Sequence, residues 1–133
     1  MKLVIIDGQS GRMGALLAER VKAAQLPCEV LAIGTNAIAT AAMMKAGADQ
    51  GATGENPVLV ACRTADVIAG PIGFLSADAL LGEITPAMAV AVGQSAAKKL
   101  LLPVNRHCGH TVVGVRDLTL SQLADELVEH LRA

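Results

Sequence analysis

The sequence predicts a single domain of the α/β class, in which helices cover both faces of a mostly parallel, doubly wound sheet. Three observations predict this class. Short apolar runs alternate with longer segments of helical periodicity, as strands alternate with helices in such folds. Glycine-rich turns follow several of the runs, and 133 residues are enough to bury one core. One domain is therefore expected to span residues 1–133.

The first part of the chain is expected to alternate strands and helices. The expected elements are a strand over residues 3–7, a helix over 12–25, a strand over 29–34, a helix over 36–46 and a short strand over 49–53. Leu26-Pro27 ends the first helix, because proline has no backbone N–H to donate. Asn36 has the side chain of a helix N-cap, and Gly47 suits the left-handed residue that follows a helix.

Residues 57–62 could form a strand or a helix. Their sequence, Pro57-Val58-Leu59-Val60-Ala61-Cys62, has the composition of a strand, but residues 66–70 form a clearer strand soon afterwards. Neighbouring parallel strands need a crossover of about a dozen residues or more, so both segments cannot be such strands. We therefore expect a short helix that extends to residue 64, with Asn56 as its cap and Pro57 as its first residue.

The second part of the chain continues the alternation. The expected elements are a strand over 66–70, helices over 74–81 and 86–97, strands over 99–104 and 111–115, and a helix over 119–131. The last strand is expected to pair antiparallel with the one before it, through a turn at residues 105–110. Thr119 and Gln122 have the spacing of a capping box. The pattern indicates a three-layer, Rossmann-like fold, in which ligands bind at the carboxyl ends of the strands.

A glycine-rich loop follows the first strand. Its sequence, Asp7-Gly8-Gln9-Ser10-Gly11-Arg12-Met13-Gly14, joins a strand to the start of a helix. Glycines let the backbone approach a ligand closely, and the N–H groups and dipole of a helix N-terminus attract an anion. We therefore expect this loop to hold the phosphate of a nucleotide. The predicted cofactor-binding residues are Gly8, Gln9, Ser10, Gly11, Arg12, Met13, Gly14, Thr35, Asn36, Gly70, Pro71, Gly73 and Asn105.

The residue types near the loop bear on which nucleotide it holds. The guanidinium of Arg12 could pair with a pyrophosphate or a ribose 2′-phosphate, or could be a solvated surface group. NAD sites usually have a carboxylate at the end of the second strand, where this chain has Gly34-Thr35-Asn36. NADP(H) is therefore favoured over NAD(H), and a mononucleotide remains open. Asp7 is expected to accept hydrogen bonds from N–H groups of the loop itself.

Residues of the types that bind metals concentrate in Arg106-His107-Cys108-Gly109-His110. No metal is expected, because this segment lacks a fourth ligand for a tetrahedral site unless Cys62 lies near it. An alternative function is an enzyme whose active site forms at the carboxyl edge of the sheet, with a thiolate at Cys108 as one candidate nucleophile. The residues proposed for that alternative are Glu55, Asn105, Arg106, His107 and Cys108. A third alternative is a structural or regulatory module whose glycines only form turns.

Composition and charge disfavour several classes of function. The formal net charge is −1 and Phe74 is the sole aromatic residue, which leaves no basic or stacking surface for nucleic acids. Hydrophobic residues make up 53%, yet no charge-free stretch is long enough to span a membrane, and no signal peptide is expected. The apolar excess is expected to form a homodimer interface. Three cysteines without a disulfide pattern fit a cytoplasmic protein.

Residues 4–14 resemble the cofactor loop of dihydrodipicolinate reductases, in which the sequence Gly-Arg-Met-Gly recurs. The resemblance implies that NADP(H) is held by Gly8, Gly11, Arg12 and Gly14. The chain departs from that family, because it has no second α+β domain with a substrate site and no His-rich catalytic motif.

Motifs along almost the whole chain are similar to those of a small bacterial family of unknown function. These motifs are Gly34-Thr35-Asn36-Ala37-Ile38-Ala39-Thr40, Gly51-Ala52-Thr53-Gly54-Glu55-Asn56, Gly70-Pro71-Ile72-Gly73, Gly82-Glu83-Ile84-Thr85-Pro86 and Gly93-Gln94-Ser95. Members of that family are short and Rossmann-like. The resemblance therefore implies the fold and no activity.

Overall fold

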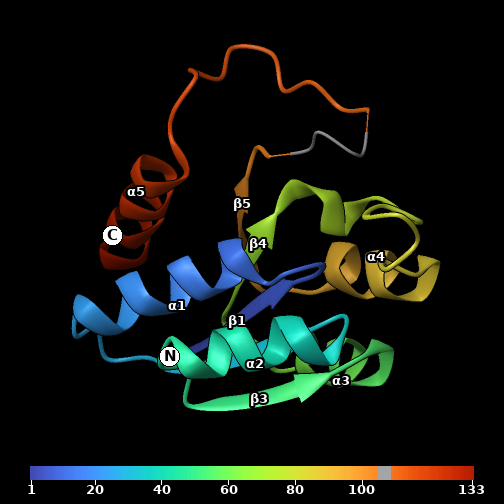
Figure 1. Ribbon diagram of the computed structural model, residues 1–133, viewed down its shortest axis with the longest axis horizontal. Helices are drawn as coiled ribbons and strands as arrows, with labels where there is room; N and C mark the ends of the chain where they lie inside the picture. Colours follow the sequence, from blue (N-terminus) through green and yellow to red (C-terminus); the bar gives the residue numbers. More distant parts are fainter. Residues whose placement is uncertain (105–108) are drawn as a thin grey trace.

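The protein is an α/β domain in the computed structural model, which describes residues 1–104 and 109–133 (Figure 1). The elements in chain order are β1 (Lys2–Asp7), α1 (Arg12–Ala23), β2 (Glu29–Gly34), α2 (Ala37–Lys45), β3 (Gln50–Thr53), α3 (Glu55–Ala61), β4 (Val67–Pro71), the 3-10 helix η1 (Ile72–Leu75), α4 (Pro86–Gln94), β5 (Lys98–Leu102) and α5 (Leu120–Arg132). The described strands form one sheet in the order β3-β2-β1-β4-β5, and every pairing is parallel. The predicted class, a parallel sheet in a three-layer fold, is confirmed.

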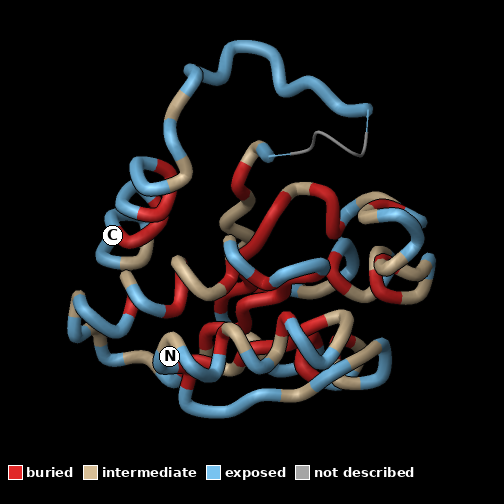
Figure 2. The backbone as a smooth tube through the Cα atoms, viewed as in Figure 1, coloured by how far each residue is buried: buried red, intermediate tan, exposed pale blue. Residues whose placement is uncertain are grey.

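The two faces of the sheet are covered by different helices. Along β1, Leu3 and Ile5 point into a core shared with α1, α2 and α5, whereas Val4 and Ile6 point into a core shared with α3 and α4. All four side chains are at most 1% exposed. Figure 2 shows this buried centre, with exposed residues around it. The strand order reverses between β1 and β4, so the carboxyl ends of these two strands mark the position where such sheets bind ligands.

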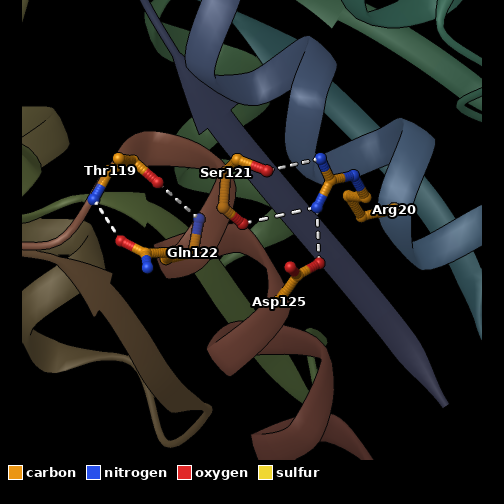
Figure 3. A network of polar contacts seen from close by, with 5 residues as sticks. All are labelled: Arg20, Thr119, Ser121, Gln122 and Asp125. Atoms are coloured by element: carbon orange, nitrogen blue, oxygen red, sulfur yellow. Dashed lines mark hydrogen bonds and ion pairs between the residues drawn. The ribbon is translucent and has the colours of Figure 1, made fainter.

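The C-terminal helix α5 packs against α1 through an apolar stripe. The buried residues of this stripe are Leu123, Ala124, Leu127 and Val128. At its rim, Arg20 of α1 donates hydrogen bonds to the hydroxyl and carbonyl oxygens of Ser121, over 2.7 and 3.3 Å, and pairs with Asp125 (Figure 3). The predicted capping box is confirmed, because Thr119 and Gln122 exchange side-chain to backbone hydrogen bonds (Figure 3).

The predicted bounds of the third and fourth helices of the chain differ by three residues at one end. Residues 57–61 are helical as expected, but α3 begins at Glu55, ends at Ala61 and not at residue 64, and has Gly54, not Asn56, as its N-cap. Pro57 is tolerated within the first turn because the N–H groups there have no acceptor inside the helix. The helix α4 ends at Gln94, three residues early, because Ser95 turns to an extended conformation and its hydroxyl donates to the carbonyl oxygen of Cys62.

The helix expected over 74–81 is wrong. Only η1 forms there, and turns follow it because Asp78, Leu80 and Leu81 have positive φ angles of 67°, 57° and 58°. These angles are incompatible with a right-handed helix.

The strand expected over 111–115 is also wrong, since these described residues are extended or turned, and exposed throughout (Figure 2). Gly114 has a φ of 84° that interrupts any strand, and β5 stays at the edge of the described sheet.

Candidate functional site

Four segments meet at the carboxyl ends of β1 and β2. They are the loop after β1, the residues that follow β2, the first turn of α1, and residues 78–84, which lead from η1 towards α4. The last of these segments is separated by about seventy residues from the first, and only the fold brings them together. We call the polar groups of this region the edge cluster: Asp7, Gln9, Thr35, Asn36 and Glu83.

Asp7 is the buried charge of this cluster, at 6% exposure. Its Oδ1 accepts from the backbone nitrogen of Gly8 over 2.8 Å, and its Oδ2 accepts from that of Gly14 over 2.7 Å. Burial raises the pKa of Asp7, and the backbone hydrogen bonds from Gly14 and Gly8 oppose that shift, while the charge of Glu83 adds to it. The predicted role of Asp7 as an acceptor for N–H groups of its own loop is confirmed.

Glu83 is the centre of the cluster. Its Oε1 accepts hydrogen bonds from the Gln9 backbone nitrogen over 2.9 Å, from the Thr35 hydroxyl over 2.5 Å and from the Asn36 side-chain nitrogen over 2.8 Å. Partial burial raises the pKa of Glu83, but the hydrogen bonds from Thr35, Gln9 and Asn36 together lower it below its ordinary value. A charged acceptor is therefore held between the glycine-rich loop and the end of β2.

Sequence reasoning did not assign Glu83 to the site. A carboxylate was sought at the end of the second strand, where Asn36 instead caps α2 by accepting from the Ala39 nitrogen over 2.9 Å. Glu83 reaches this place from the connection between the helices that were expected over residues 74–81 and 86–97, where the structure has a turn. Nothing in the local sequence signals that contact, because it depends on how the turn at residues 78–84 packs against the residues that follow β1 and β2.

Each glycine of the predicted phosphate loop has a packing reason of its own. A Cβ on Gly11, whose φ is 73°, would lie 2.6 Å from the Cα of Ala39 in α2. A Cβ on Gly14 would lie 2.5 Å from Met43 Sδ, and one on Gly8 would lie 2.7 Å from Thr35 Oγ1. The glycines thus let α1, α2 and the edge cluster approach one another, a requirement that exists with or without a ligand.

The remaining predicted loop residues lie at the rim of the site. Gln9 and Ser10 are exposed, and Met13 packs against the core under α1. Arg12 is exposed at the start of α1 and lines a hollow of about 500 Å³ between α1 and the N-terminus of α5, near Thr119 and Ser121.

The predicted residues after β4 lie deeper. Gly70, Pro71 and Gly73 are all buried. A side chain on Gly70 would overlap the Phe74 ring and the carbonyl oxygen of Ile6. These residues therefore form the floor between β1 and β4, on which the loop segments rest. Asn105, also predicted to contact a cofactor, lies outside the described residues.

The residues of the alternative enzyme site are only partly described. Glu55 is exposed at the first position of α3. Asn105, Arg106, His107 and Cys108 lie outside the described residues. His110, also in this motif, lies with its Nε2 3.0 Å from the hydroxyl of Ser76. Within residues 1–104 and 109–133, no group of three or more His, Cys, Asp or Glu side chains is placed to hold a metal ion.

A separate cavity of about 430 Å³ lies beside the edge strand β5. Its walls are mainly apolar side chains from β5, from residues 112–118 and from α5, with Arg116, Glu126 and His130 among the polar ones. Arg116 donates to Glu126 over 2.9 Å. This cavity shares no residue with the edge cluster. None of the described helices is both long and apolar enough to cross a membrane.

Comparison with known families decides the assignment of the chain. The model of a family described as a domain of unknown function, DUF3842, matches residues 2–133. The chain belongs to the DUF3842 family. The prediction that it belongs to a family of unknown function is thereby confirmed. No curated protein matches this DUF3842 chain.

Among solved structures, the DUF3842 chain is similar to a dodecameric FMN-dependent Ubix-like decarboxylase from Escherichia coli O157:H7. The two share 13% sequence identity, and the alignment covers 100% of this chain and 96% of that one, with a TM-score of 0.49. A likeness at this level carries no inference about the ligand or activity of DUF3842.

Proposed function

We propose that this protein binds a nucleotide at the carboxyl edge of the sheet, between residues 8–14 and the end of β2. The observation that supports the proposal is the edge cluster, in which polar groups from two segments distant in sequence, the loop after β1 and the residues after β2, converge on Glu83. The cluster lies beside the point where the strand order reverses, which is where open parallel sheets bind ligands.

The phosphate of the nucleotide is assigned to the rim of the loop. The N–H groups of Gly8 and Gly14 are already engaged by Asp7, and that of Gln9 by Glu83. The donors proposed for phosphate are therefore the backbone N–H groups of Ser10 and Arg12, with the guanidinium of Arg12 beside them. Nicotinamide dinucleotides are the first ligands to test, since the loop resembles an NADP(H) loop.

A second candidate, a structural module with no ligand, is favoured by a different observation. Every glycine of the loop that was predicted to approach a phosphate is also required by packing against Thr35, Ala39 or Met43. The glycine spacing by itself therefore does not distinguish the two candidates, and only a binding measurement can.

A dye-monitored thermal shift with NAD(H), NADP(H), ATP, GTP, FMN and FAD tests the proposal. A ligand at about a hundred times its Kd adds roughly 2.7 kcal/mol to the free energy of unfolding, which raises Tm by several degrees. Arg12→Ala should reduce that shift. The matched control is Arg63→Ala, because Arg63 is also an exposed arginine and lies just after the C-terminal end of α3. Unchanged Tm with every nucleotide would reject binding and leave the structural module.

We also propose that the chain self-associates. Large apolar side chains remain exposed in the described residues, including Ile38 at 72%, Leu81 at 87% and Val113 at 92%. Such surface is typical of a subunit interface. Light scattering coupled to gel filtration should give a mass at least twice the 13.6 kDa of the chain, and a monomeric mass would reject the proposal.

A further inference from the structure

The two oxygens of the Glu83 carboxylate are in different situations. Oε1 accepts three hydrogen bonds, from Gln9, Thr35 and Asn36, which is more than the roughly two lone-pair sites of one carboxylate oxygen. Among the described residues, no hydrogen bond reaches Oε2. With respect to residues 1–104 and 109–133, Glu83 is therefore an oriented carboxylate with one oxygen fixed by hydrogen bonds and one available as an acceptor.

The turn that carries Glu83 is held firmly. The nitrogen of Asp78 donates to the carbonyl oxygen of Ile84 over 2.7 Å, and the nitrogen of Ile84 donates to that of Ala79 over 3.1 Å. Ile84 is 1% exposed and anchors the turn in the core under α4. Leu80 and Leu81 keep left-handed conformations that L-residues adopt only when their surroundings require it. The turn thus fixes the position of the carboxylate.

The charges around Glu83 favour a neutral hydrogen-bond donor over an anion. All three groups that contact Oε1, from Gln9, Thr35 and Asn36, are uncharged. The nearest charge within the edge cluster is a second carboxylate, Asp7, whose pKa is raised in part by Glu83. A phosphate placed at Oε2 would face both carboxylates, whereas a hydroxyl group would donate to one of them.

We propose, on the basis of the nucleotide site proposed above, that Oε2 of Glu83 accepts a hydrogen bond from the ribose 2′-hydroxyl of the ligand. Glu83 then takes the place of the carboxylate that is absent from the end of β2, although it comes from a different segment. The site selects a ribose with a free 2′-hydroxyl, and the ligand class is NAD(H) or a 5′-ribonucleotide, not NADP(H).

Fluorescence titration with NADH and NADPH measures this selectivity directly. The chain has no Trp or Tyr, so the nicotinamide signal is read without protein emission or energy transfer. We expect NADH to bind roughly tenfold more tightly than NADPH, the effect of one hydrogen bond to a charged group. Calorimetry with AMP and 2′-deoxy-AMP should likewise show tighter binding of AMP. These two probes differ only in the 2′-hydroxyl, so this comparison tests the hydroxyl without adding a phosphate.

The variant Glu83→Gln isolates Oε2. Its amide oxygen keeps the three donors at the position of Oε1, while its amide nitrogen replaces the free acceptor with a donor. The NADH-to-NADPH ratio of affinities should fall to about one or reverse. Glu29→Gln is the matched control, because Glu29 is exposed at the opposite end of β2 and should leave the ratio unchanged.

The outcomes separate this inference from the proposed function. If the wild-type protein binds none of the four probes, both are rejected. If it binds NADPH as tightly as NADH, or if Glu83→Gln leaves the ratio unchanged, nucleotide binding stands and the role of Glu83 is rejected. If Glu83→Gln is less stable to heat but has the same NADH-to-NADPH ratio of affinities, the role of Glu83 is to stabilise its turn. If Glu83→Gln binds all four probes more tightly than the wild type does, the Glu83 carboxylate occupies the ligand site and ligands displace it, and its proposed role is rejected.

Discussion

The Oδ2 oxygen of Asp7 lies 2.7 Å from the backbone nitrogen of Gly14, so the end of β1 caps the first turn of α1. The same carboxylate also accepts from Gly8 through Oδ1. A buried carboxylate in this position uses both of its oxygens to accept from backbone N–H groups of the loop.

The variant Asp7→Asn should lower the free energy of unfolding by about 1–3 kcal/mol. Asparagine offers one acceptor, and its amide nitrogen would face the N–H of either Gly8 or Gly14. Urea unfolding measures the change. Asp78→Asn is the control, because Asp78 is exposed and asparagine tolerates its positive φ, so the change there should stay within about 0.5 kcal/mol. A more stable Asp7→Asn protein would mean that the N–H groups of Gly8 and Gly14 do not need two acceptor oxygens.

Glu83 should contribute stability that depends on pH in a defined direction. Its pKa in the folded protein is lowered from 4.5, so its contribution is fully present above about pH 4.5 and is lost as the pH falls through the folded-state pKa. The stability difference between the wild type and Glu83→Gln should therefore shrink as the pH is lowered below 4.5. Urea unfolding from pH 7 to pH 3 tests this, and a difference that grows towards low pH would contradict the lowered pKa.

Asp7 should act with the opposite sign. Because burial raises its pKa above 3.8, the folded protein binds more protons than the unfolded chain between the two pKa values. Its contribution to stability therefore falls as the pH rises from 3.8 through the folded-state pKa, and is constant above it. Asp7→Asn cannot titrate at this position, so its free energy of unfolding should not show this fall between pH 3.8 and the folded-state pKa of Asp7. Parallel pH profiles for the wild type and the variant would show that Asp7 has no raised pKa.

Gly11→Ala should be strongly destabilising, by at least about 2 kcal/mol. The φ of 73° is unfavourable for alanine, and the added Cβ would collide with the backbone of Ala39. Gly93→Ala is the matched control, since a Cβ there meets nothing within 4 Å and the residue lies inside α4. That control should be neutral or more stable by up to about 1 kcal/mol. Thermal unfolding compares the two, and similar Tm values would show that α1 and α2 are less closely packed than described.

The docking of α5 should depend more on its apolar stripe than on its ion pair. Leu127→Ala should cost about 2–5 kcal/mol, because Leu127 is 3% exposed in the core under α1. Arg20→Ala should cost about 1 kcal/mol or less, since the Asp125 side chain it contacts is 66% exposed (Figure 3). Urea unfolding of both variants checks the order, and equal losses would mean that the contacts of Arg20 with Ser121 matter more than their exposure indicates.

The sequence was informative where local chemistry decides the structure. The apolar runs of β1 and β2, the cap at Asn36 and the capping box at Thr119 each depend on neighbouring residues, and each was predicted correctly. The segment 74–81 was predicted wrongly, because its apolar residues also fit a helix by composition. The positive φ angles at Leu80 and Leu81 belong to a turn that is closed by backbone hydrogen bonds between residues 78 and 84, and the periodicity of apolar residues does not encode them.

The candidate site divides in the same way. Asp7 could be placed on the loop from the sequence, because its partners Gly8 and Gly14 are one and seven residues away. Glu83 could not, because its partner Gln9 is seventy-four residues distant. By itself, the sequence determined the alternation of strands and helices, and with it the edge of the sheet where loops gather. Only the tertiary structure decided which carboxylate faces that edge, because the contact requires two distant segments to pack on the same strand ends.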